Sequence, residues 1–585
     1  MKKILREPLL YVLPLLAVIY LATIPGKIEF SDTKITRNNK TENIKLPYSV
    51  EMLPQEPFLI SFKLSVENTR EAKFNLIPDN CIEYILINGK PFPLDGIEGL
   101  CDYGKGAYFD FSGYAQKGLN DFEIYIINHG GPGGLRIEAP YNEFKSLSTM
   151  HYFFALLLLI SLALILRKFK FKSIAIAIIL VGAAIRLIAY TYMGPTQFSF
   201  DAEAHLEYIQ IVSEEKRVPK INETWSSFHP PLYYIVSAAI KNTADLFAPD
   251  SAYRILQQGQ VLISFASIAF GVALIISLFG NCWLAYLAAF ISVLWPGFVL
   301  AAPRIGNDGL FYLGALFCMF FAQRYWNLRK NLDVFLASLG ASIALAAKSS
   351  GFVILAAWII IYIFNALRLL KIASLRALFA SIFVIALFAG LSNYRTIADI
   401  FEGKKFELVA NSSGLNGGMA LKNFAGNYMY FDLKEHITVP YITAWSDDGG
   451  RQYFWNYALK TSLAFYSNIS LMNSYAGRTL ATMLNILALL IFALALWGMM
   501  HAKAKEFPAL FFTLSLFAAL IYLRVSIPFA SSNEFRHIMP VLFPLAYFAM
   551  RGTQILPDSR VRKFVYMALL SFAVLSFAFV AGNSI

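Results

Sequence analysis

The hydrophobic and polar residues of this chain fall into three successive patterns. A basic start at 1–7 is followed by an apolar run at 8–24, and the next stretch carries short segments separated by Gly, Pro and Asn. From His151 onward, apolar runs of about 17–25 residues recur, which is the length needed to cross a bilayer. The pattern predicts three parts: an N-terminal membrane anchor (1–27), an all-β domain (28–147) and a polytopic α-helical membrane domain (148–585).

The first apolar run has two interpretations. It is either a cleaved signal peptide or a retained anchor. No small-x-small cleavage site precedes Lys27, which favours the anchor. In both cases the domain that follows is exported.

The predicted β domain has segments that alternate between apolar and polar residues or run apolar for a few positions. They lie at 58–66, 81–89, 107–114 and 121–128. This pattern is typical of a β-sandwich. The stretch 114–140 resembles the closing strands of galactose-binding-like jelly-roll domains, which often bind sugar. A likeness of fold does not establish binding, so a structural or partner-docking role stays open.

Four cysteines divide between the two parts of the chain. Cys81 and Cys101 share the β domain, and they are candidates for a disulfide if that domain faces an oxidising compartment. Cys282 and Cys318 lie in apolar runs, where cysteine is usually a small core residue.

The membrane topology depends on one ambiguous segment, 231–247. It begins with two prolines and carries Lys241 and Asp245, so we expect an amphipathic helix in the interface and no span. The runs that we expect to span are 152–166, 173–193, 256–279, 282–301, 309–323, 333–347, 351–367, 375–392, 477–499, 508–526, 537–550 and 564–581. With the first segment they make about thirteen spans.

With that assignment, the basic loops gather on one side of the membrane, as the positive-inside rule expects. The N-terminus is then cytoplasmic and the C-terminus outside, in an inner or plasma membrane. The outer face receives the β domain, the loop 194–254 and the long loop 393–475, together with every distinctive polar motif.

The loop 194–254 contains the most acidic segment of the membrane domain. Carboxylates at a membrane edge are costly and usually functional, and one of them can take a proton as general base. Asp201 and His205 are four residues apart and share one side of a helix, whereas Glu203 points elsewhere unless the loop begins with a non-helical turn that brings it back. We predict Asp201 and Glu203 as catalytic carboxylates, with Asp201 as the general base, and His205 as a cavity residue. The alternative for Asp201 is a helix N-cap.

Several basic residues lie at the predicted outer ends of spans, against the positive-inside rule. A lipid phosphate is their natural partner, although snorkelling to the interface is the alternative. Arg254 and Lys348 are the strongest candidates for phosphate ligands, and His229 could bind phosphate or acceptor. The other candidates are Arg304 and Arg536 for the phosphate, and Arg395 and Asp308 for the cavity. Arg536 could equally form an ion pair within the protein.

Composition changes this picture little. The net charge of +12 could suggest nucleic acid, but the chain is 57% hydrophobic and 15% charged and its basic residues lie between apolar runs. We therefore expect no nucleic-acid partner. No cofactor is required. Asp201, Glu203 and His205 would suit a divalent metal, and the sequence does not decide whether one is bound.

The order of several motifs resembles that of GT-C glycosyltransferases of the protein-O-mannosyltransferase and lipid A aminoarabinose-transferase type. The motifs are FDAEAHLEYI, FHPPLYY, Tyr253-Arg254, PRIGNDGLFYLGALF, LAAKSSGF, Asn393-Tyr394-Arg395, DDGGRQYFWNYALKTSL and NEFRHIMPVLFP. They cover most of 173–550. One position departs from the family pattern: Ala202 follows Asp201, where an Asp-Glu pair is usual.

The resemblance implies an inverting transfer of a sugar from a polyprenyl-phosphate donor to an exported acceptor in the cell envelope. It implies Asp201 as base, with Arg254, Lys348 and His229 at the donor phosphate. Two other functions stay open, a transporter or flippase of lipid-linked saccharide and a sugar-binding assembly protein. A transporter should keep ionisable groups near the bilayer centre, and among the predicted spans only Arg186 fits that expectation.

Overall fold

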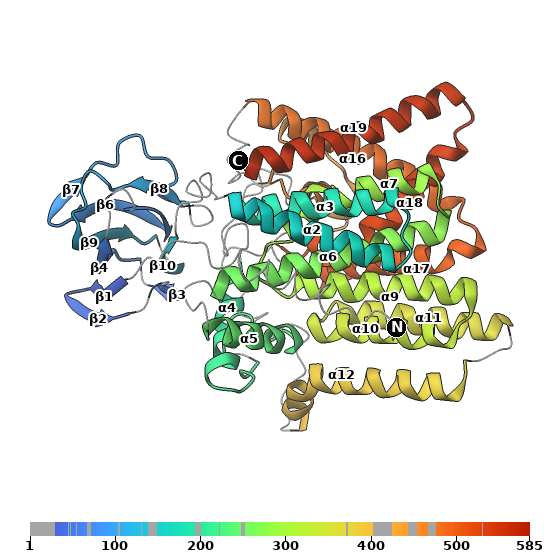
Figure 1. Cartoon of the computed structure of the whole chain (residues 1–585), viewed down its shortest axis with the longest axis horizontal. Coiled ribbons are helices and arrows are strands. Elements are labelled where there is room, and N and C mark those ends of the chain that lie inside the picture. Colours follow the sequence, from blue (N-terminus) through green and yellow to red (C-terminus); the bar gives the residue numbers. More distant parts are fainter. Residues whose placement is uncertain are drawn as a thin grey trace.

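The structure is a computed structural model with an N-terminal β domain beside a large helical domain (Figure 1). It describes residues 30–44, 46, 48–53, 55–66, 69, 72–102, 106–129, 131–138, 149–192, 201–221, 223–246, 252–369, 373–401, 424–442, 453–465, 475–528 and 531–584. The predicted anchor 1–27 lies outside the described residues.

The β domain is a two-sheet antiparallel sandwich. One sheet has the order β2-β1-β4-β9-β6-β7 and the other β3-β10-β5-β8. The strands are β1 (Phe30–Arg37), β2 (Lys40–Asn43), β3 (Tyr48–Leu53), β4 (Phe58–Val66), β5 (Lys73–Asp79), β6 (Cys81–Ile87), β7 (Lys90–Phe92), β8 (Ala107–Asp110), β9 (Gly118–Ile127) and β10 (Gly131–Glu138).

Alternating apolar residues of the strands form the core of the sandwich. β4 and β9 bury every second side chain, as expected of strands with one face on a core. Phe62 and Phe122 pair across these strands with ring centroids 5.2 Å apart, and Phe74 from the other sheet packs on Phe122. The predicted strand 58–66 is confirmed, and Cys81 and Cys101 form a disulfide.

The helical domain consists of long apolar helices and short ones between them. They are α2 (Thr149–Lys168), α3 (Ser173–Tyr192), α4 (Ala202–Glu214), α5 (Leu232–Asp245), α6 (Ala252–Phe279), α7 (Trp283–Val293), α8 (Pro296–Leu300), α9 (Asp308–Leu328), α10 (Asn331–Ala347), α11 (Gly351–Leu369), α12 (Leu375–Phe401), α13 (Gly426–Met429), α14 (Leu433–Thr438), α15 (Phe454–Ser462), α16 (Tyr475–Met500), η8 (Ala504–Glu506), α17 (Phe507–Ser526), η9 (Phe535–Val541), α18 (Leu542–Ile555) and α19 (Ser559–Ser584).

Within the described residues, 7 helices are long and apolar enough to cross a membrane, so the expected class, a polytopic helical protein with a β domain, is confirmed. The predicted total of about thirteen spans is not confirmed. Prolines explain two of the differences between the predicted spans and the observed helices. The predicted span 282–301 breaks at Pro296 into α7 and α8, and 537–550 opens as the η9 turn around Pro540, because proline cannot continue a helix.

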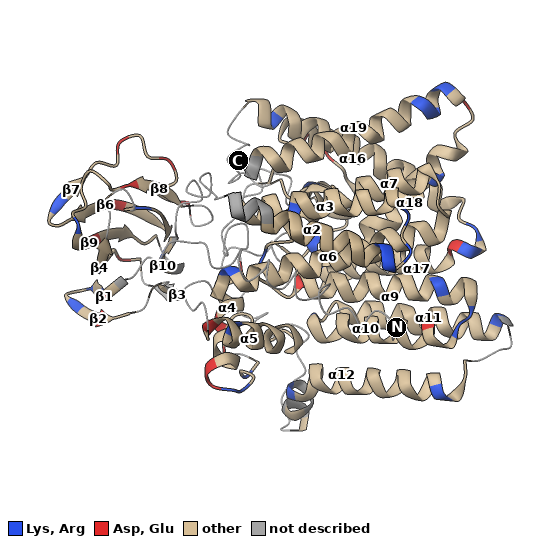
Figure 2. Cartoon of the chain, viewed as in Figure 1, with Lys and Arg blue, Asp and Glu red and all other residues tan. Residues whose placement is uncertain are grey.

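The ambiguous segment 231–247 forms α5, which is not among these candidate spans. Tyr233 and Tyr234 are buried on one side of α5, while Ile235 and Val236 are exposed. This two-sided helix packs on α4 and α6. In Figure 2 the Lys and Arg residues of the helical domain gather mostly at the end remote from the β domain, the distribution on which the expected orientation depends.

Candidate active site

Asp201 precedes α4, and its carboxylate contacts a distant part of the chain. It occupies the N-cap position but makes no side-chain capping bond. Instead, Arg536 Nη1 donates to Asp201 Oδ2 at 3.1 Å. Arg536 also pairs with Glu534, so it bridges two acids. The Asp201 carboxylate is therefore part of an ion-pair network, and capping does not explain its presence.

A second pair lies next to the first. Asp308, the first residue of α9, pairs with Lys348, which follows α10 directly. The Lys348 ammonium also lies 3.2 Å from His537 Nδ1. Because His537 follows Arg536 in the chain, η9 joins the two pairs into one cluster.

The cluster draws its residues from segments far apart in sequence. Asp201, Asp308, Lys348, Arg536 and His537 come from the starts of α4 and α9, the end of α10 and the η9 turn. Carboxylates therefore lie beside cations at the ends of apolar helices. Burial would raise the pKa of Asp201, but the positive charge and the hydrogen bond of Arg536 act against it, and the pKa lies below its usual value. Asp201 is ionised at neutral pH.

Two neutral histidines line the same region. His205 Nδ1 lies 2.8 Å from the Tyr234 hydroxyl, and the Tyr234 ring stacks on Tyr208 at 3.5 Å. Burial lowers the pKa of His205 to about 4. The His229 ring lies 5.7 Å from that of His205, and burial lowers its pKa well below the usual range. His229 Nδ1 has no hydrogen-bond partner among the described residues, so it has a free position for a ligand.

Arg395, which the sequence predicts at the cavity, binds the backbone of a neighbouring loop. Its guanidinium donates to three backbone carbonyls, those of Pro219, Ser227 and His229, at 2.6–2.8 Å. These bonds hold the loop before α5 against α12. Arg395 thus positions His229, and its donors are directed at the backbone.

The remaining predicted phosphate ligands are Arg254 and Arg304. Arg254 is buried, donates to Gln257 Oε1 at 2.5 Å, and lies 4.2 Å from the centroid of the Tyr190 ring. Arg304 is half-buried, and its guanidinium makes no hydrogen bond or ion pair with the residues that the structure describes. Among the cations predicted to bind the donor phosphate, Arg304 therefore has the fewest hydrogen bonds and ion pairs to the residues that the structure describes.

Glu203 does not join the cluster. Its carboxylate pairs with Arg136 of β10, on the opposite side of the first turn of α4 from the Asp201–Arg536 contact. Asp201, Glu203 and His205 consequently do not converge, and within the described ranges no group of three His, Cys, Asp or Glu residues could hold a metal ion.

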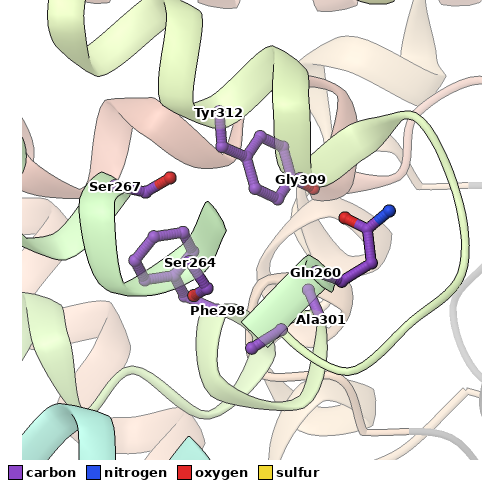
Figure 3. A pocket seen from close by; sticks show the side chains of 8 residues that line it. Gln260, Ser264, Ser267, Phe298, Ala301, Gly309 and Tyr312 are labelled. Atoms are coloured by element: carbon purple, nitrogen blue, oxygen red, sulfur yellow. The ribbon is translucent and has the colours of Figure 1, made fainter. Parts of the chain in front are cut away.

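A small cavity adjoins the cluster between α6, α8 and α9 (Figure 3). Gln260, Ser264, Tyr312 and Gly309 contribute to its wall, and Gly309 follows Asp308 directly. The Tyr312 hydroxyl donates to the Arg536 carbonyl at 2.8 Å. The cavity measures about 10 Å³, roughly the room for one water molecule, so it is too small for a sugar.

Sequence reasoning missed three residues at this site. His537 and Tyr234 lie inside recognised motifs, FRH and HPPLYY, and a search for polar groups there could have found them. Arg136 lies in the β domain, 67 residues from Glu203, and no local signal connects the two.

No known family model and no curated protein sequence matches this chain. The crystal structure of ArnT from Cupriavidus metallidurans bound to undecaprenyl phosphate is similar, with 12% identity, a TM-score of 0.41, and coverage of 70% of this chain and 76% of ArnT. The arabinosyltransferase EmbB from Mycobacterium smegmatis shares 12% identity at a TM-score of 0.30, with 97% of this chain and 65% of EmbB covered. Similarity at this level assigns neither a family nor an activity to the chain.

Proposed function

We propose that the protein is an inverting glycosyltransferase that moves a sugar from a polyprenyl-phosphate donor to an exported acceptor. One observation supports this most: a carboxylate, Asp201, lies in the same cluster as the cations Lys348 and Arg536, at the ends of apolar helices. A lipid-linked sugar has a hydrophobic tail, a phosphate and a polar head. A site for it needs cations and a carboxylate together at a membrane edge.

The proposed reaction is a direct displacement at the anomeric carbon. The acceptor oxygen forms the new bond, the bond from that carbon to the phosphate oxygen breaks, and polyprenyl phosphate leaves. The acceptor proton passes to Asp201. Attack from the face opposite the leaving group inverts the anomeric configuration. Lys348, Arg536 and Arg304 stabilise the negative charge that develops on the leaving phosphate.

The ion pairs of the cluster suggest how binding prepares the base. Arg536 holds the pKa of Asp201 low. A donor phosphate competes with Asp201 for Arg536, and when this cation turns to the phosphate the pKa of Asp201 rises. A carboxylate with a higher pKa accepts a proton more readily, so donor binding makes Asp201 a better base.

Replacement of Asp201 by Asn tests the proposal. We expect transfer to fall by about a hundredfold or more, while binding of the donor to the purified protein persists. Mass spectrometry of glycolipids from cells with and without the protein first identifies the lipid-linked sugar. Transfer is then measured as the loss of this sugar donor in membranes. Glu214→Gln, at the end of the same helix, is the matched control and should retain wild-type transfer. Wild-type transfer by Asp201→Asn would remove Asp201 from the mechanism.

A transporter of lipid-linked saccharide is the second candidate, because Arg186 is a buried charge within α3. Its guanidinium donates to Ser264 Oγ at 2.8 Å and to the Gly182 and Val293 carbonyls. Proteoliposomes with a fluorescent polyprenyl-linked sugar separate the two functions. A transporter moves the lipid between leaflets without an acceptor, whereas a transferase leaves it in place until an acceptor is added.

A further inference from the structure

We propose that the β domain helps to shape the active site. Arg136 of β10 pairs with Glu203 and so positions the first turn of α4. This inference rests on the proposed function, since it gives Asp201 a catalytic role. Arg136 is then a positioning residue that acts on Asp201 through Glu203, and Glu203 is an anchoring residue.

The contact itself links the two domains. Arg136 Nη1 pairs with Glu203 Oε1. The Arg136 side chain is only 12% exposed, and that of Glu203 is 38% exposed. Because Glu203 lies two positions after Asp201, any displacement of Glu203 moves the backbone that carries the proposed base.

The sheet that carries Arg136 is buried on both of its faces at this point. β4 and β9 of the six-stranded sheet alternate between buried and accessible residues, as strands with one solvated face do. β5 of the four-stranded sheet instead has an unbroken buried run from Phe74 to Pro78. Ile77, on the face away from the sandwich core, is 3% exposed, and it is the residue opposite Arg136.

A third charged group supports the same arrangement. Asp79 is two residues after Ile77 on β5, so it lies diagonally across from Arg136 on the same face of the sheet. Burial raises the pKa of Asp79 to about 6, and the negative charge of Glu203 adds to this effect while Arg136 opposes it. Arg136 therefore lies between an acid of the β domain and an acid of α4.

The first turn of α4 depends on such contacts. Asp201 makes no capping bond, so two ion pairs restrain this turn: Arg536 holds Asp201, and Arg136 holds Glu203. The aromatic pair Tyr208–Tyr234 restrains the helix only further along. Loss of the Arg136 contact frees the turn on one side, and small displacements of a catalytic group are costly in rate.

Replacement of Arg136 by Ala tests the inference. We expect kcat for transfer to fall about tenfold or more, with KM for the donor unchanged, because the donor cations are untouched. Arg136→Lys should recover part of the loss, because it keeps the positive charge between Asp79 and Glu203. Arg217→Ala is the matched control. It removes exposed ion pairs with Glu215 and Glu223 in the segment that follows α4, and it should not change kcat.

A short bismaleimide cross-linker between Arg136→Cys and Glu203→Cys, in a background without Cys282 and Cys318, tests the docking independently of catalysis. A spacer is needed because the ion pair joins the tips of two long side chains, a separation that a direct disulfide does not span. We expect the cross-link to form in the full-length protein in membranes, and transfer to persist when it has formed. Absence of the cross-link, or wild-type kcat in Arg136→Ala where Asp201→Asn is inactive, would overturn the inference and leave the proposed function standing. Wild-type transfer by Asp201→Asn itself would instead overturn the proposed function, whatever the cross-link shows.

Discussion

At the scale of single residues, the role of each charged side chain depends on which group it contacts. Asp201 and Glu203 are separated by one residue, but one faces Arg536 and the other faces Arg136. The sequence predicts Arg395 at the cavity and Arg536 at the donor phosphate, yet the first binds backbone carbonyls and the second binds carboxylates. Burial of a cation requires a partner for its charge, and only the fold determines which partner is near.

Replacement of Arg536 by Gln should move the pH dependence of transfer. Transfer requires ionised Asp201, so it is full above the pKa of this carboxyl and is lost as the pH falls through it. Arg536 lowers that pKa. Without it, burial dominates, and the acid limb of kcat/KM, which reports the enzyme before the donor binds, should rise by about 1–3 pH units. Rates at each pH are normalised to the maximum of each variant. An acid limb at the wild-type position would show that Arg536 does not set the pKa of Asp201. Arg217→Gln, which removes an exposed guanidinium, serves as the control.

At the scale of helices, close packing brings the second ion pair together. α9 begins at Asp308 and α10 ends before Lys348, and these two helices cross at Gly314 and Gly340. A Cβ atom at Gly340 would lie 2.6 Å from the Cys318 nitrogen and 2.9 Å from the Gly314 carbonyl oxygen. The backbones therefore approach as only glycine permits, as in other membrane helices with small residues at their contacts.

Gly340→Val should force α9 and α10 apart. The extra atoms meet backbone, which cannot rotate away, so we expect a loss of stability of about 1–3 kcal/mol and a fall in transfer as Asp308 and Lys348 separate. Thermal unfolding of the purified protein and transfer in membranes measure the two effects. Gly390→Ala in α12, where a Cβ would meet nothing within 4 Å, is the control. Equal melting temperatures for both variants would contradict the packing argument.

At the scale of the whole molecule, the β domain lies at one end of the helical domain, beside α4 (Figure 1). The proposed site is at this same end, whereas the Lys and Arg residues of the helical domain gather mostly at the other (Figure 2). The positive-inside rule then predicts an orientation with the β domain and the site outside the cytoplasm, a compartment in which the Cys81–Cys101 disulfide would be stable.

Cysteine labelling tests this orientation. In a background without Cys282 and Cys318, Lys117→Cys in the β domain should react with a membrane-impermeant maleimide on intact cells. Arg560→Cys, at the start of α19, should react only after permeabilisation. Both positions are exposed, so a difference in reaction reports the side of the membrane. Reaction of both on intact cells would contradict the predicted orientation.

The sequence alone determined the class of each part of the chain and where its polar motifs lie. Alternation at 58–66 predicted β4, and the prolines and charges of 231–247 predicted a helix that does not span. These features depend on neighbours along the chain, because periodicity and helix-breaking residues act locally. Asp201, Lys348 and Arg536 could for the same reason be placed at the ends of apolar segments.

Only the tertiary structure decided which of these residues meet. It paired Asp201 with Arg536 and Glu203 with Arg136, and it turned Arg395 toward the backbone. An ion pair between residues 335 positions apart has no local signature, because its energy depends on distance and burial in space, and these arise from the packing of the whole molecule.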